Sequence, residues 1–280
     1  MMKINSKQQN IKSKLNLSFL LLSNYDGAIL KVKEMVLNML KVIAINSSSR
    51  KMNTYQLITE VKEILKNNNI NVEIINLFDY DIKACIGCEH CLVKGGCVLK
   101  DDTFHIMEKI KLSDGIILTS PVYMENVSGK LKTFIDRTCS WFHRPEIYGK
   151  PVLVISTTMG SGLKPTLKYL ERVVIQWGGF NVGKIGRSIR TMDNKIRESE
   201  CENFITHLIM EKENYKPSLN ALINFQVQKV LSYKLVGLDS EYWEEKGWNS
   251  EVYYFKCRTN NFNRPIATSF GKFLNKVVNK

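Results

Sequence analysis

The chain has 280 residues, of which 44% are hydrophobic and 24% charged, and its formal net charge is +13. This content is enough for one full core plus an appendage or for two small domains, and no run of eighteen apolar residues is present to span a bilayer. Basic residues are spread along the chain without a block of five like charges, which argues against a nucleic-acid-binding stripe and for a solvated basic surface.

Residues 1–38 precede the first convincing strand. They contain four early lysines and the apolar stretch "LNLSFLLL" at 15–22, but no small-x-small cleavage site follows that stretch. We therefore interpret 1–38 as an N-terminal extension that is poorly ordered or reflects a misassigned start. Without a credible secretory signal, the expected compartment is the cytoplasm.

Residues 39–212 alternate between short apolar runs and segments with helical periodicity. The expected strands are 41–46, 72–77, 115–123, 151–157 and a weaker 181–189. The expected helices are 54–69, 101–115, 128–141, 164–179 and a segment around 195–212. This alternation predicts an α/β fold, a flavodoxin-like doubly wound sheet of five parallel strands. Ligands of such sheets lie at the carboxyl ends of the strands.

The loop after the first strand reads "NSSSRKMNT" at 46–54. Its hydroxyls, its arginine and the following helix start make a plausible phosphate site, because helix N-termini offer unpaired N–H groups. The candidate residues are Ser47, Ser48, Ser49, Arg50, Asn53 and Thr54. The structural alternative is ordinary helix capping by Asn53 or Thr54.

The loop after the third strand begins "SPVYMENVSGKLKTFIDR" at 120–137. Pro121 stiffens the chain as it leaves the sheet. The main-chain groups of Val122, Tyr123 and Met124 could then meet the polar edge of a flat ring, and Tyr123 could stack on its face. Without its flanking motif, Tyr123 would read as a partly buried loop aromatic.

Together these two loops resemble those of the NADPH-dependent FMN reductase family. That family shares the flavodoxin-like fold, and its first loop runs Gly-Ser-x-Arg, a spacer and Asn-Thr; here Ser47 replaces the glycine and the spacer is one residue short. The resemblance implies FMN as cofactor and NAD(P)H as a potential electron donor. The turn after the fourth strand is also rich in small residues, and its Thr157, Thr158 and Gly160 could let the flavin ring approach the backbone closely.

Four of the seven cysteines lie in "CIGCEHCLVKGGC", as Cys85-x2-Cys88-x2-Cys91-x5-Cys97. A disulfide framework is disfavoured in a large chain without a signal peptide. An iron–sulfur cluster, zinc and unmetallated thiols remain as interpretations; the ferredoxin run opens similarly but ends in Cys-Pro, whereas Val98 follows here. His90 is expected to face solvent, and Cys139, Cys201 and Cys257 to be buried structural thiols.

A compact cysteine motif within this fold resembles the iron–sulfur flavoproteins of anaerobes. The resemblance implies a [4Fe–4S] cluster on the insert 85–97, near FMN, and an oligomer. The leading hypothesis is an FMN-dependent oxidoreductase with NAD(P)H- or ferredoxin-linked electron transfer, in which no side chain need be catalytic. The alternatives are an electron carrier that serves a partner protein such as ferredoxin, and a redox-sensing binding module.

Residues 213–280 break the β/α rhythm and form a predicted C-terminal appendage, helical at first and then aromatic in "EYWEEKGWNSEVYYF". Four of these aromatic residues could pack on a neighbouring subunit, cover a flavin or form a small satellite core: Trp243, Trp248, Tyr253 and Tyr254.

Overall fold

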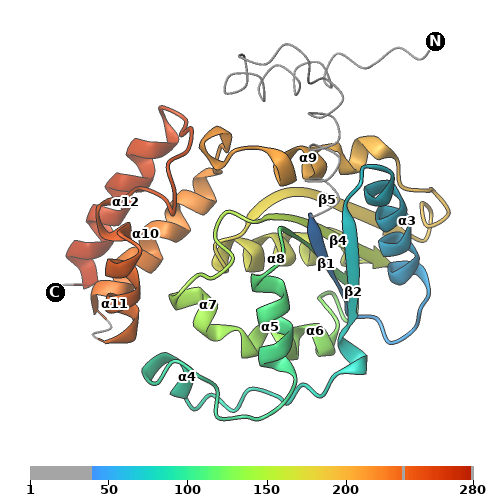
Figure 1. Ribbon diagram of the computed structural model, residues 1–280, viewed down its shortest axis with the longest axis horizontal. Helices are drawn as coiled ribbons and strands as arrows, with labels where there is room; N and C mark the ends of the chain where they lie inside the picture. Colours follow the sequence, from blue (N-terminus) through green and yellow to red (C-terminus); the bar gives the residue numbers. More distant parts are fainter. Residues whose placement is uncertain (1–39, 235–236, 279–280) are drawn as a thin grey trace, which may run out of the picture. The chain divides into compact units, whose positions relative to one another are not determined.

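The computed structural model describes residues 40–234 and 237–278, so the predicted extension 1–38 lies outside the described residues (Figure 1). Five strands form one parallel sheet in the order β2-β1-β3-β4-β5. They are β1 (Lys41–Asn46), β2 (Asn71–Asn76), β3 (Gly115–Pro121), β4 (Pro151–Thr158) and β5 (Phe180–Ser188). The predicted flavodoxin-like sheet is confirmed, including its weakest strand, β5.

Helices cover both faces of the sheet, which explains why β3 and β4 are buried at every position. One face packs against α5 (Thr103–Lys111), α6 (Gly129–Arg137) and α8 (Leu163–Gln176). The other packs against α3 (Asn53–Asn67) and α9 (Glu198–Ile209). Successive strand residues therefore enter opposite cores, as Ile43 and Ala44 of β1 do.

The C-terminal residues form a third core of their own. It is built by α10 (Leu219–Lys234), α11 (Leu238–Glu245) and α12 (Asn263–Val278), with the aromatic stretch between the last two helices. Trp243 is fully buried there, and Trp248, Tyr253 and Tyr254 are each at most 5% exposed. The satellite core is thus the interpretation that the structure supports for these aromatic residues.

The strand order reverses between β1 and β3, so the loops that follow these two strands start side by side. The loop after β4 lies next to them, because β4 pairs with β3 to its last residues. Two short helices, α4 (His90–Val93) and α7 (Cys139–His143), complete the region. No helix within 40–234 or 237–278 is long and apolar enough to cross a membrane.

Candidate functional site

Ser47 connects the loop after β1 to its neighbours. Its side chain is fully buried, and its hydroxyl donates to the carbonyl of Thr119 at 2.9 Å. Its own carbonyl accepts from the hydroxyl of Ser128, the N-cap of α6, also at 2.9 Å. A buried hydroxyl needs such a partner. Ser47 therefore holds the loop in place, and its hydroxyl is committed to the protein.

The start of α3 has no side-chain cap. Its N-cap is Met52, which makes no side-chain capping hydrogen bond. Asn53 and Thr54 lie inside the helix and turn toward the β4 loop: Asn53 Nδ2 lies 3.6 Å from the sulfur of Met159, and Thr54 Oγ1 lies 2.6 Å from Thr157 Oγ1. The capping alternative is therefore wrong: neither Asn53 nor Thr54 caps this helix.

The outer part of this loop is exposed. The Ser48 hydroxyl donates to the carbonyl of Arg50 at 2.9 Å, which folds the loop on itself. Ser49 and Arg50 are exposed, and neither side chain has a polar partner among the described residues. Ser49 and Arg50 are thus the two side chains of the predicted phosphate site that are ready to meet a ligand.

The loop after β3 is held by main-chain hydrogen bonds, one to β4 and one within the loop. The Val122 N–H donates to the Thr157 carbonyl at 2.8 Å, and the Tyr123 N–H donates to the Asn126 carbonyl at 2.8 Å. Two of the three amides expected to face a ring are thereby committed, whereas Met124 has no such bond within the described part of the chain. The tip is exposed, 44% for Tyr123 and 98% for Met124. Pro121 is buried as the last residue of β3.

The turn after β4 contacts the β3 loop. Thr158 Oγ1 donates to the carbonyl of Ser161 at 2.7 Å and accepts from the N–H of Gly160 at 3.1 Å. Gly162 has φ +81°, and a Cβ there would lie 2.7 Å from Val122 Cγ1. The Ser161 hydroxyl also bonds the Glu125 carboxylate. The three loops therefore form one connected edge of the sheet.

Gly162→Ala is expected to destabilise the protein by about 1–3 kcal/mol, because alanine would have to adopt a left-handed conformation and overlap Val122. Gly160→Ala is the matched control in the same turn, since a Cβ there would meet nothing within 4 Å. Thermal and urea unfolding of both variants measure the difference. Equal stabilities would contradict this packing of the two loops.

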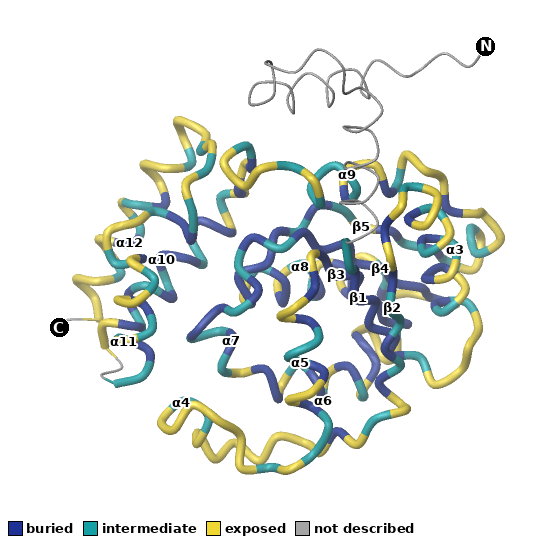
Figure 2. The backbone as a smooth tube through the Cα atoms, in the orientation of Figure 1, coloured by how far each residue is buried: buried dark blue, intermediate teal, exposed yellow. Residues whose placement is uncertain are grey.

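The cysteine segment, residues 85–97, runs along the surface (Figure 2). Cys85, Cys88 and Cys97 are exposed, and Cys91 in α4 is half-buried. Burial, and then the nearby thiols of Cys97 and Cys85, raise the pKa of Cys91. Within the described residues, no three His, Cys, Asp or Glu side chains are gathered as a metal site.

Two further features of this segment concern its glycine pair and its histidine, which was expected to face solvent. Gly95 has φ +83°, a conformation that glycine adopts without strain and that turns the chain. His90 is exposed, and its Nδ1 lies 2.8 Å from the carbonyl of Gly96.

Arg137 closes the base of the cysteine segment. Its side chain is only 2% exposed, and its guanidinium bonds both carboxylate oxygens of Asp101 and, at 2.9 Å, the carbonyl of Lys83. The third contact is to the sulfur of Cys97, 3.3 Å from Nη2. Burial by itself would raise the pKa of Asp101, but hydrogen bonds from Arg137 and from main-chain amides lower that pKa to about 2. The buried Arg137 guanidinium thus links Lys83, which precedes the cysteine segment, to Asp101, which follows it, and it also contacts the thiol of Cys97.

Arg144 contacts the middle of the segment. It donates to the carbonyl of Cys91 and, at 3.4 Å, to that of Leu92, and it is paired with Asp239 of α11. Cys139, at the start of the adjoining α7, is exposed and lies near the thiol of Cys91, so its expected burial as an isolated structural thiol is wrong. Cys201 is buried as expected. A single sequence carries no signal for these contacts, because Arg144 and Asp239 are 95 residues apart.

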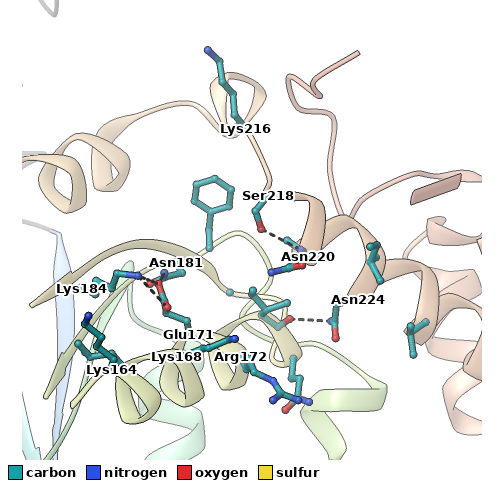
Figure 3. A pocket seen from close by; sticks show the side chains of 18 residues that line it. Lys164, Lys168, Glu171, Arg172, Asn181, Lys184, Lys216, Ser218, Asn220 and Asn224 are labelled. Atoms are coloured by element: carbon teal, nitrogen blue, oxygen red, sulfur yellow. Dashed lines mark hydrogen bonds and ion pairs between the residues drawn. The ribbon is translucent and has the colours of Figure 1, made fainter. Parts of the chain in front are cut away.

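A broad groove of about 1050 Å³ lies elsewhere, between α8, the start of β5 and α10 (Figure 3). Its charged lining consists of Lys164, Lys168, Glu171, Arg172, Lys184 and Lys216. Glu171 pairs with Lys184 at 3.1 Å and accepts from Asn181 at 3.0 Å. None of the predicted flavin or cysteine residues lines this groove, so it is separate from the candidate site.

The chain matches the NADPH-dependent FMN reductase family over residues 40–190, and it belongs to that family. This match covers more than half of the chain and spans all five strands. Family membership makes the protein a flavoprotein oxidoreductase with the fold seen here.

Within the family the chain is similar to proteins named iron–sulfur flavoprotein. One from Archaeoglobus fulgidus is 34% identical over 75% of this chain and 100% of its own length. Another from Clostridioides difficile is 27% identical over 72% of this chain and 94% of its own. A second Archaeoglobus fulgidus relative is 43% identical over 35% of this chain and 49% of that protein, about half its length. The expected family and the iron–sulfur flavoprotein-like branch are both confirmed.

Proposed function

We propose that the protein is an FMN-dependent oxidoreductase that carries a [4Fe–4S] cluster beside the flavin and transfers electrons from NAD(P)H or a ferredoxin. One observation carries the FMN part of this proposal. In a chain of the FMN reductase family, the loops after β1, β3 and β4 are joined into one edge at the switch in strand order, beside an uncapped helix end. Flavodoxin-like sheets bind FMN at this switch.

The residues present fit FMN. The N–H groups at the start of α3, with Ser49 and Arg50, would hold the phosphate, because a helix N-terminus and a guanidinium both favour an anion. Tyr123, Met124 and the main chain near Gly160 would border the ring, since these groups are exposed or open on the same edge. The hydrogen bond between Thr54 and Thr157 would fix the distance between the phosphate-binding loop and the loop that borders the ring.

The charge around the cysteine segment fits a cluster. Four thiolates around iron and sulfide make an anionic group, whose charge nearby cations offset. Arg137 reaches Cys97 and Arg144 reaches the Cys91 carbonyl, so two guanidinium groups lie at the segment. Three of the four thiols are exposed, and within the described residues they are not gathered as a metal site, so we infer that the segment closes as Cys85, Cys88, Cys91 and Cys97 bind the cluster. The names of the relatives support this assignment.

A flavin exchanges one or two electrons and a cluster exchanges one, so the two together can divide an electron pair. The chain's own contribution would be to bind, orient and shield these groups, and the chemistry proposed needs no side chain as a catalytic acid or base. We further propose that the protein acts in the cytoplasm as a homo-oligomer, by analogy with the family.

A second candidate is an electron carrier without its own small-molecule substrate. The tip of the β3 loop favours it, because Met124 is 98% exposed and leaves the proposed flavin edge open to a partner protein. Anaerobic stopped-flow reduction distinguishes the two: rapid reduction by NADH or NADPH supports the enzyme. Inertness to both, with rapid reduction by ferredoxin, supports the carrier and contradicts NAD(P)H dependence.

Arg50→Met is expected to weaken FMN binding about tenfold while leaving riboflavin binding unchanged, because riboflavin lacks the phosphate that Arg50 would contact. Fluorescence titration of the flavin-free protein with both ligands measures this difference. Lys51→Met, one position along the same exposed loop, is the control and should leave both affinities near the wild-type values. If Arg50→Met lost affinity for FMN and riboflavin equally, the assignment of the FMN phosphate to this loop would be contradicted.

A further inference from the structure

The C-terminal appendage holds the segment 142–145, which comprises the end of α7 and the two residues after it. Side chains from α10 and α11 donate hydrogen bonds to three main-chain carbonyls of this short segment. They are Gln228 Nε2 to Phe142 at 2.7 Å, Trp243 Nε1 to His143 at 2.8 Å and Tyr242 Oη to Pro145 at 2.8 Å. Three carbonyls in four residues are thereby fixed by residues about a hundred positions later in the chain.

Asp239 of α11 adds a buried charge to this contact. It is 4% exposed, and its two carboxylate oxygens face different partners: one bonds Arg144, and the other lies 3.0 Å from Nδ1 of His143. A buried carboxylate that is satisfied on both oxygens fixes the groups around it, and removing its charge leaves a buried cation without compensation.

Arg144 links Asp239 to the cysteine segment. Its Nη2 donates to the carbonyl of Cys91 in α4, and its Nη1 donates both to the Asp239 carboxylate and to the carbonyl of Leu92. The same helix α11 touches the segment a second time, because Leu238 Cδ1 lies 3.4 Å from the position of a Cβ on Gly95. In Figure 1, α4 accordingly lies at the end of α11 and beside α7.

We propose that the appendage positions the cysteine segment, and that Asp239 is the positioning residue. It holds the Arg144 guanidinium against the Cys91 carbonyl and so keeps a positive charge beside the thiols. This inference rests on the proposed cluster for its redox consequence, but the ordering of the segment is a property of the chain itself. The appendage is thereby assigned a role in the redox site, although it lies outside the flavodoxin-like sheet.

The test uses the full-length variant Asp239→Asn, purified anaerobically, with Glu245→Gln as the matched control. Glu245 lies on the same helix with its side chain 76% exposed and makes only a 3.9 Å pair with Lys246. We measure iron released to a chelator over time, FMN per chain, and hydrogen–deuterium exchange of residues 85–97 in the cluster-free protein. In Asp239→Asn we expect release and exchange to be about threefold to tenfold faster, with FMN retained. Glu245→Gln should match the wild type.

Wild-type rates in Asp239→Asn, for both iron release and exchange, would overturn the proposal. If the wild-type protein holds no iron, the proposed cluster fails, while the exchange rates still decide whether Asp239 orders the segment. Should Asp239→Asn lose FMN and its cooperative melt as well, Tyr242→Phe replaces it, because it keeps the aromatic ring and removes only the hydroxyl that donates to the Pro145 carbonyl. Faster exchange in 85–97 then supports the proposal, and unchanged exchange refutes it.

Discussion

Cys88→Ser is expected to remove the cluster almost completely, from about four iron atoms per chain to near none, while FMN remains bound. A serine hydroxyl does not replace a thiolate as an iron ligand, and Cys88 is exposed, so the change leaves the protein core intact. FMN should stay because its proposed residues lie on the loops after β1, β3 and β4. Iron, sulfide and flavin quantified after anaerobic purification, with the visible spectrum, measure the effect.

Cys139→Ser is the control for this prediction. Cys139 is also exposed and lies near the thiol of Cys91, but it lies outside the four-cysteine motif. It should keep its full iron content. If Cys139→Ser lost iron as completely as Cys88→Ser, or if Cys88→Ser kept it, the assignment of Cys85, Cys88, Cys91 and Cys97 as the ligand set would be wrong.

Asp101→Asn is expected to lower the free energy of unfolding by about 3 kcal/mol, because it leaves the buried Arg137 guanidinium without its counter-charge. Asp101 also accepts main-chain hydrogen bonds from Lys83 at 2.9 Å and Thr103 at 3.0 Å, which the amide can satisfy only in part. Urea unfolding measures the change. Asp136→Asn, which breaks the exposed pair with Lys132, is the control and should cost less than about 0.5 kcal/mol.

The Asp101–Arg137 pair also makes the free energy of unfolding depend on pH. The pKa of Asp101 is lowered to about 2 in the folded protein, so its stabilising contribution is complete above an unfolded pKa of about 4. That contribution is lost as the pH falls from there toward 2. The stability difference between the wild type and Asp101→Asn should therefore shrink over this acidic range, and a difference that stays constant down to pH 2 would contradict the pairing.

Features with a local cause could be predicted from the sequence. The apolar runs that became β1, β3 and β4 are fully buried almost throughout, and the alternation of strands and helices was enough to infer the parallel sheet and its ligand-binding edge. His90 was expected to face solvent, and it is exposed. The family followed from two loops whose residue types are specific in combination.

Features that depend on partners distant in the chain could not be predicted. Ser47 lies in the expected loop, but its hydroxyl is committed to Thr119, 72 residues away. Thr54 was a candidate cap, but it meets Thr157 across the sheet edge. The contact of Arg144 with the cysteine segment depends on the appendage folding back onto α7, which no periodicity or motif encodes. These long-range contacts decide which polar groups are left for a ligand.

One measurement tests the proposed function most directly: anaerobic purification followed by an absorption spectrum and the quantification of flavin, iron, sulfide and zinc per chain. We predict stoichiometric FMN together with about four iron and four sulfide per chain. Colourless protein that takes up no FMN on reconstitution would contradict the flavin site. Zinc in place of iron and sulfide, with FMN present, would contradict the cluster alone.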